Sequence, residues 1–87
     1  MTAVHLPKTL LPLFDGLDQV QEANGATVGE ALAALDERWP GLLDRLCEPG
    51  PQPRRHILLF VDGDPAEIDT PVPDGSRIDV ITAITGG

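Results

Sequence analysis

The sequence predicts a single α+β domain in which a β-sheet is covered by one main helix. Three observations lead to this prediction. The length of 87 residues suits one domain. One segment has strong helical periodicity, and short apolar segments flank it on both sides, as in sheets with the helix on one face. Hydrophobic residues make up 41% of the chain and charged residues 23%, which is ordinary globular composition and argues against disorder.

The main helix is expected to begin after Thr27 and to end at Trp39. Thr27 is a suitable N-cap, and Glu30 three residues later completes a capping box. The apolar side chains that recur at helical spacing on one face are Val28, Ala31, Leu32, Leu35 and Trp39. Pro40 stops the helix, and residues 41–46 are expected to add another turn.

Five segments are predicted to be strands: 3–7, 17–23, 57–61, a short edge strand at 66–69, and 77–84. Residues 57–61 are all apolar, which predicts a strand covered on both faces or nearly so. In the last strand Ile78, Val80 and Thr82 point to one face, and Arg77, Asp79, Ile81 and Ala83 to the other. Residues 47–55 are rich in proline and are expected to form a surface loop.

The charge balance excludes some classes of partner. The chain has 14 acidic residues against six Lys and Arg, and its formal net charge is −8. Nucleic acid and anionic membrane surfaces are therefore disfavoured. A basic partner protein would be attracted, although the excess of acid can equally serve solubility alone. The N-terminal residues lack the features of a signal peptide, and no apolar run is long enough to span a membrane, so we expect a cytoplasmic protein.

Side chains with obvious chemistry are scarce. The only histidines are His5 and His56, and Cys47 is the only thiol. They have no metal-ligand spacing, and there is no glycine-rich phosphate-binding motif. A Cys and His pair could act as nucleophile and base, but no local signature supports this role. We therefore expect no metal site and no bound cofactor, and we expect the scattered carboxylates to lie on solvated surfaces.

The remaining reactive group is the carboxylate at the end of the sequence, which reads ITAITGG. A carboxylate resists nucleophiles, but coupling to AMP makes an acyl-adenylate that a sulfur or amine nucleophile can attack. Gly86 and Gly87 suit entry into the narrow active site of another enzyme, since glycine permits close backbone approach. If the odd-numbered face of the last strand is exposed, Ile81 and Ala83 form an apolar patch that leads to the tail. The alternative is that the two glycines at the end of the sequence have no function.

Several segments together resemble a known family. The order of elements, the helix region TVGEALAALDERWPGLLDRL, the segments LLFVDG and VPDGSRIDVI, and the terminal TGG resemble the ubiquitin-like sulfur carriers of the ThiS and MoaD type. The resemblance covers nearly the whole chain. It implies a β-grasp domain at residues 1–84, with a mixed sheet of four to five strands whose first and last strands are parallel and central. It also implies a flexible tail at residues 85–87.

The same resemblance implies a carrier rather than an enzyme. An E1-like adenylating enzyme would activate Gly87 with ATP and magnesium, and sulfur would replace one oxygen to give a thiocarboxylate. A downstream biosynthetic enzyme would then accept the sulfur. Ile81, Ala83 and Ile84 would dock on the activating enzyme, while Thr85, Gly86 and Gly87 would enter its active site.

The chain also departs from the family pattern. Thr82 and Ala83 stand where relatives often have aromatic or proline residues. The long loop at 47–55 resembles the carriers of cysteine biosynthesis or of specialised-metabolite pathways, while thiamin and molybdopterin pathways stay open. Two other functions also stay open: a protein modifier that forms isopeptide bonds to lysine, and a β-grasp interaction module with an unreactive tail.

Overall fold

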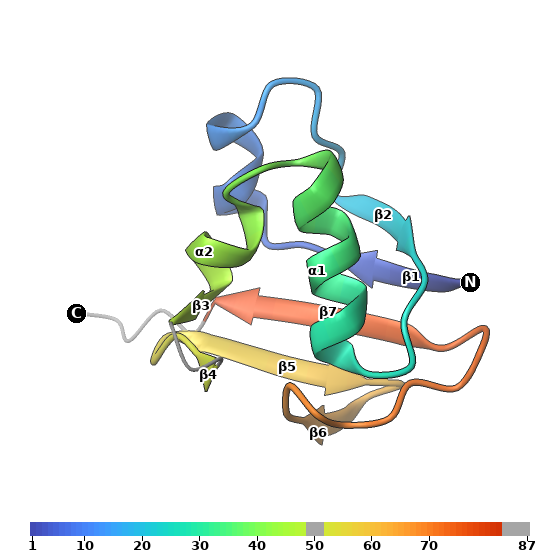
Figure 1. The fold of residues 1–87 in the computed structure, drawn as a ribbon. Helices are drawn as coiled ribbons and strands as arrows, with labels where there is room; N and C mark the ends of the chain where they lie inside the picture. The colour runs from blue at the N-terminus through green and yellow to red at the C-terminus, as the bar shows by residue number, and fades with distance from the viewer. Residues whose placement is uncertain (49–51, 83–87) are drawn as a thin grey trace.

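The computed structural model describes residues 1–48 and 52–82, which form a mixed sheet with the helices packed on one face (Figure 1). The strands are β1 (Thr2–His5), β2 (Val20–Ala23), β3 (Cys47–Glu48), β4 (Gln52–Pro53), β5 (Ile57–Val61), β6 (Asp64–Ala66) and β7 (Arg77–Thr82). The helices are the 3-10 helix η1 (Lys8–Leu13), α1 (Val28–Arg38) and α2 (Leu42–Leu46). This arrangement confirms the α+β class and the main helix on one face.

The main sheet has five strands in the order β2-β1-β7-β5-β6. β1 and β7 are parallel and lie side by side, with Val4 opposite Ile78, and all other neighbours are antiparallel. The first and last long strands of the chain are therefore the parallel central pair, as in a β-grasp fold. This topology confirms the predicted fold. Because β7 is the central strand, its C-terminal end lies between the ends of β1 and β5.

The N-terminus of α1 is closed by both partners of the predicted capping box. The Thr27 hydroxyl accepts a hydrogen bond from the Glu30 N–H at 3.2 Å. The Glu30 carboxylate accepts from the N–H of Ala26 at 3.1 Å, one residue before the N-cap. The first two helical N–H groups, those of Val28 and Gly29, donate to the carbonyls of Thr70 and Ile68. The first turn therefore leaves few backbone donors unsatisfied.

Gly29 has a packing role at this junction. A Cβ built on Gly29 would come within 2.6 Å of Ile68 Cγ2, so a side chain there would force the two segments apart. The close approach lets the segment that follows β6 lie against the start of α1. This contact explains why a glycine is tolerated inside the first turn of an otherwise strong helix.

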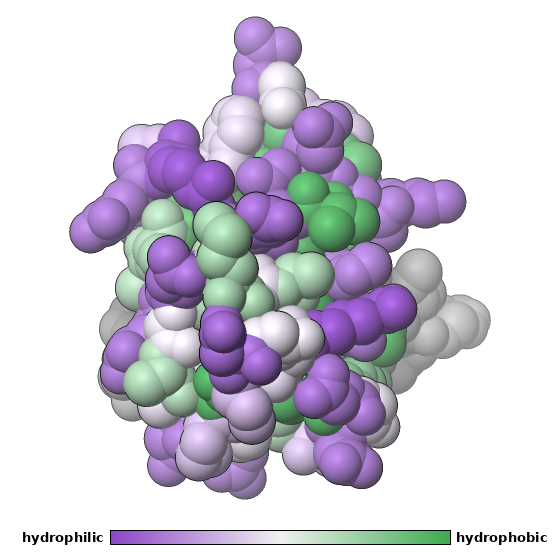
Figure 2. All heavy atoms as spheres, turned by 90° about the vertical axis from the view of Figure 1, so that its right-hand side faces the viewer, coloured by the Kyte–Doolittle hydropathy of each residue, from purple (hydrophilic) through white to green (hydrophobic). Residues whose placement is uncertain are grey.

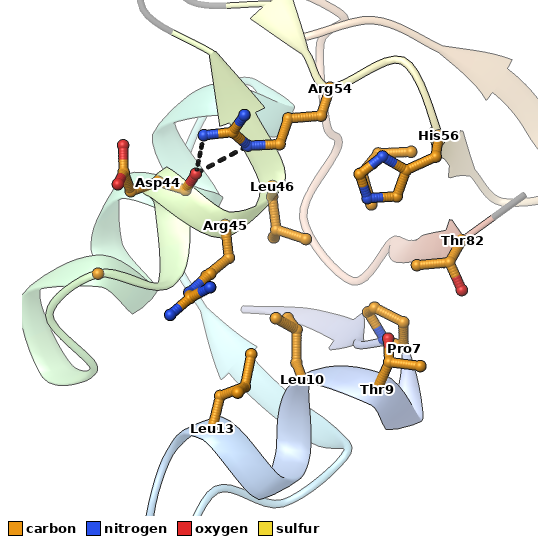
Figure 3. A pocket seen from close by; sticks show the side chains of 12 residues that line it. Pro7, Thr9, Leu10, Leu13, Asp44, Arg45, Leu46, Arg54, His56 and Thr82 are labelled. Atoms are coloured by element: carbon orange, nitrogen blue, oxygen red, sulfur yellow. Dashed lines mark hydrogen bonds between the residues drawn. The ribbon is translucent and has the colours of Figure 1, made fainter.

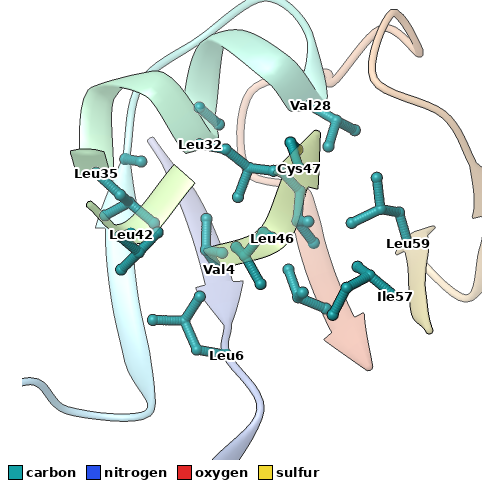
Figure 4. Packing of buried hydrophobic residues seen from close by; sticks show 14 of the residues in the cluster. Val4, Leu6, Val28, Leu32, Leu35, Leu42, Leu46, Cys47, Ile57 and Leu59 are labelled. Carbon is teal, nitrogen blue, oxygen red and sulfur yellow. The ribbon is translucent and has the colours of Figure 1, made fainter. Parts of the chain in front are cut away.

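The hydrophobic core lies between the sheet and the helices (Figure 4). Leu32 and Leu35 of α1 and Leu42 of α2 are fully buried, and they pack over the central strands, where Val4 and Ile78 are also fully buried. Because these residues are aliphatic, dispersion and burial of apolar area supply most of the stabilisation. The predicted apolar face of the helix is thus confirmed.

The proline-rich segment was expected to be only a loop, and this expectation was wrong in part. β3 and β4 form a small antiparallel hairpin in which Cys47 lies opposite Pro53. The buried Cys47 side chain fixes β3 on the core, and the Arg54 N–H donates to the Leu46 carbonyl at 2.9 Å. A two-residue strand needs few N–H donors, so proline is tolerated in it.

The short edge strand is shifted from its expected position. β6 is Asp64–Ala66, whereas the sequence pattern indicated 66–69. The intervening turn residues Asp62 and Gly63 both have positive φ, at 49° and 87°. This is the two-residue hairpin geometry that Asp-Gly favours, and it returns the chain to the sheet at once. The strand therefore starts directly after the turn.

Candidate functional site

The candidate site is the end of β7 together with the sheet face that the helices leave uncovered. Thr82 is the last residue of β7 and lies opposite Ile57 of β5. Of the residues that the sequence singled out, Ile81 lies in β7. Ala83, Ile84, Thr85, Gly86 and Gly87 lie outside the described residues, as does the boundary predicted at residue 84.

Ile81 points away from the core. Its side chain is 45% exposed, whereas its neighbour Val80 is 3% exposed on the opposite face. The expectation that the odd-numbered residues of the last strand face outward is therefore confirmed at this position. This exposed isoleucine lies one residue before the end of the central strand.

Leu58 and Phe60 extend this surface, and sequence reasoning missed both. The pattern of β5 predicted cover on both faces, but Leu58 is 45% exposed and Phe60 is half-buried. Leu58 lies directly opposite Ile81 in the antiparallel register, so the two side chains form one cross-strand pair. The expectation was wrong because the helices cover only one face of the sheet. The missing signal is the pairing of β5 with β7, which the apolar pattern alone does not contain.

A charged row borders this apolar pair. Arg77 and Asp79 form an ion pair on the same face, with Nη2 and Oδ1 2.9 Å apart. Asp79 lies opposite Phe60 on one side and His5 on the other. We define the docking face, named for the partner contact that is proposed below, as Ile81, Leu58, Phe60, Arg77 and Asp79. It combines an apolar centre with a fixed pair of charges, which suits recognition of a specific partner surface.

Cys47 is poorly suited to nucleophilic chemistry. Its side chain is 5% exposed, and burial raises the pKa of the thiol, an effect that the charge of Arg54 opposes but does not cancel. Because the thiolate is the reactive form, a buried thiol with a raised pKa reacts slowly. Within the described ranges, no group of three or more His, Cys, Asp or Glu side chains is arranged to hold a metal ion.

We expect Cys47 to resist alkylation in the folded protein. At pH 7.5–8, iodoacetamide should label it at a small fraction of the rate seen in urea-unfolded protein, because the folded thiol is both inaccessible and protonated. Intact mass against time measures the two rates. Equal rates in the folded and unfolded protein would show that Cys47 is an accessible thiol and would reopen a role for it in chemistry.

Fold and surface together define a class of protein. A small domain with this β-grasp topology and an exposed apolar sheet face is a ubiquitin-like protein. The model of the ThiS family matches residues 4–87, and the chain belongs to that family. It is a carrier of the ThiS and CysO type. No helix among the described residues is long and apolar enough to cross a membrane.

Similar proteins agree with this assignment. The sulfur carrier protein CysO of Mycobacterium tuberculosis is 26% identical over 90 residues, which cover 97% of this chain and 96% of CysO. The structure of a BexX/CysO complex from Amycolatopsis orientalis contains a chain that superposes with a TM-score of 0.87 at 27% identity, with both chains fully covered. The crystal structure of SAMP1 from Haloferax volcanii has a TM-score of 0.76 at 24% identity, and it covers 99% of this chain and 98% of its own, which supports the fold alone.

Proposed function

We propose that the chain carries sulfur as a thiocarboxylate on Gly87 and delivers it to a biosynthetic enzyme. The observation that carries the proposal is the ThiS family match, which extends through residue 87 and so includes the glycine pair. The scarcity of reactive side chains in the described residues agrees with a role as a protein substrate. The chemistry would belong to partner enzymes, as the resemblance implies.

The proposed reaction has two steps. A Gly87 carboxylate oxygen attacks the α-phosphorus of ATP, so that an acyl-adenylate forms and pyrophosphate leaves. A sulfur nucleophile provided by the E1-like partner then attacks the acyl carbon and displaces AMP. With hydrosulfide as the nucleophile, the products are the thiocarboxylate on Gly87, AMP and one proton. A persulfide donor would first give an acyl disulfide, whose S–S bond a thiol reductant would then cleave to leave the thiocarboxylate. ATP and magnesium are bound by the partner, and since cells keep ATP in the cytoplasm, we place the protein there.

The docking face gives the reaction its specificity. Residues 83–87 follow directly on β7, and five residues span at most about 17 Å when extended. A partner that buries Ile81 and Leu58 would therefore have its active site within that distance of Thr82. The relative CysO in the Amycolatopsis orientalis structure is found in a complex with BexX, so a protein of this fold does engage a partner. For this chain, as a carrier of the CysO type, we propose that the enzyme that accepts the sulfur belongs to cysteine or specialised-metabolite biosynthesis.

We expect Ile81→Asp to weaken activation and to leave the fold intact. The substitution places a charge where the partner is proposed to bury an apolar side chain, so the KM for the carrier should rise about tenfold or more. ATP–pyrophosphate exchange by the E1-like enzyme measures KM, and thermal unfolding measures stability.

Ala33→Asp is the control for this substitution. Ala33 is exposed in α1, which packs on the other face of the sheet. It should change KM by less than about twofold. Wild-type KM for Ile81→Asp would remove Ile81 from the docking face, and unfolding of that variant would mean that Ile81 supports the core.

A further inference from the structure

The charge around the end of β7 is opposite to the charge of the molecule as a whole. Two hollows of about 620 and 330 Å³ adjoin this strand end, and Pro7, Thr9 and Thr82 line both of them. Four of the six Lys and Arg residues line the hollows, but only two of the 14 Asp and Glu residues do. Both histidines line them as well. The cationic members are Lys8, Arg45, Arg54 and Arg77.

The two acidic residues in the hollows do little to cancel these cations. Asp79 is already paired with Arg77. The Asp44 carboxylate points away from the larger hollow, while its main-chain oxygen accepts two hydrogen bonds from Arg54, at 3.0 and 2.8 Å (Figure 3). Lys8 and Arg45 form no ion pair among the described residues. Lys8, Arg45 and Arg54 therefore present net positive charge beside Thr82.

The opposite end of the sheet is acidic. Asp62 accepts a hydrogen bond from the N–H of Arg77 at the start of β7, Asp64 begins β6, and Asp74 pairs with the amine of Met1. Figure 2 looks onto this end and shows mostly hydrophilic residues. Twelve of the 14 acidic residues lie outside the two hollows, so the net charge of −8 does not describe the surface beside Thr82.

We propose that the surface beside Thr82 binds an acidic rim around the active-site entrance of the activating enzyme. This inference rests on the proposed function, because that function brings residues 83–87 into a partner active site. The cations lie in two hollows on either side of Thr82 and do not converge on one point. An extended row of partner carboxylates matches that spacing better than a single phosphate group does.

The first test is the double variant Lys8→Glu/Arg45→Glu. We expect its KM in ATP–pyrophosphate exchange to rise about tenfold or more at about 50 mM NaCl and to approach the wild-type KM at about 500 mM, because salt screens exposed charges. The kcat should stay within about twofold, since Gly87 is unchanged.

The control for general charge is Arg38→Glu/Arg55→Glu, which alters net charge equally at positions outside both hollows. It should leave KM within about threefold of wild type. Equal effects of the two double variants, or no effect of the first one at low salt, would overturn the proposal. Thermal unfolding of both variants verifies that they are folded.

Chemical cross-linking separates this inference from the proposed function, because it measures binding without catalysis. Lys8 is the only lysine of the chain, and the amine of Met1 lies beside Asp74 in a different peptide. A cross-link made by a carbodiimide, which joins amines to carboxylates, can therefore be assigned to Lys8 by peptide mass. Without ATP, Lys8 of the full chain should cross-link to Asp or Glu residues of the E1-like enzyme, and Arg45→Lys should add a second site.

The absence of a Lys8 cross-link, despite a complex detected by gel filtration, would overturn the proposed acidic rim. Dependence of the cross-link or of the low-salt affinity on bound ATP would assign the cations to phosphate and would also overturn it. Absence of pyrophosphate exchange with wild type would instead reject the proposed function.

Discussion

Deletion of Gly86 and Gly87 is expected to abolish adenylation by the E1-like enzyme. The reacting carboxylate would then belong to Thr85, and the chain would be two residues shorter, which withdraws the carboxylate by up to about 7 Å. A side chain would also enter a channel that we propose accepts only glycine. ATP–pyrophosphate exchange should fall to the background rate measured without carrier, whereas unfolding by urea should be unchanged within about 0.5 kcal/mol.

Two further variants test separately whether the length of the tail and the absence of a side chain at its end are required for adenylation. Gly87→Ala keeps the length and adds one methyl group, and an extra glycine after Gly87 keeps the side-chain-free end and extends the reach. Both should reduce exchange strongly, because the adenylation site must hold the reacting oxygen in one position. Full exchange by the truncated protein would show that the glycine pair is incidental, and the interaction module would then be the better interpretation.

Leu32→Ala is expected to lower the free energy of unfolding by about 2–5 kcal/mol. Leu32 is fully buried near the centre of α1 and belongs to the hydrophobic core cluster. The loss combines the transfer free energy of the removed atoms with the cost of the cavity. Since small domains have only about 5–15 kcal/mol in total, the variant should be partly unfolded near physiological temperature.

Urea unfolding followed by circular dichroism measures this loss, with Leu13→Ala as the control. Leu13 is 52% exposed at the end of η1 and should cost less than about 1 kcal/mol. A cost for Leu32→Ala no larger than that of Leu13→Ala would contradict the packing of α1 on the sheet. Leu35→Ala, at an equally buried position, should repeat the result for Leu32.

The sequence predicted the helix and the central strands because their signals are local. The capping residues Thr27 and Glu30 and the apolar face of α1 act within one helix, and the alternation in β7 acts within one strand. The outward direction of Ile81 follows from that alternation. The resemblance to sulfur carriers then supplied the topology, including the parallel pairing of β1 with β7, which no local pattern contains.

The features that were missed depend on contacts between distant segments. Exposure of Leu58 is decided by which face of the sheet the helices cover, and its role beside Ile81 depends on the register of β5 with β7. The hairpin of β3 and β4 exists because Cys47 is anchored in the core. The cationic surface is assembled from Lys8, Arg45 and Arg54, which are far apart in a sequence that is acidic overall.

The pathway that receives the sulfur is decided by the acceptor enzyme. A protein modifier would share the adenylation step but would leave Gly-Gly remnants on lysines of other proteins. Isolation of such remnants by proteolysis and mass spectrometry, with no thiocarboxylate, would favour that function. A carrier releases its sulfur and returns with its carboxylate restored.

The most direct test is the intact mass of the purified chain after incubation with its E1-like enzyme, ATP, magnesium and a sulfur donor. We expect a species in which one oxygen atom is replaced by one sulfur atom, and fragmentation should place the change at Gly87. The species should be absent without ATP and with the Gly86 and Gly87 deletion. An unchanged mass, under conditions in which the same enzyme catalyses pyrophosphate exchange with this chain, would contradict the thiocarboxylate and with it the proposed function.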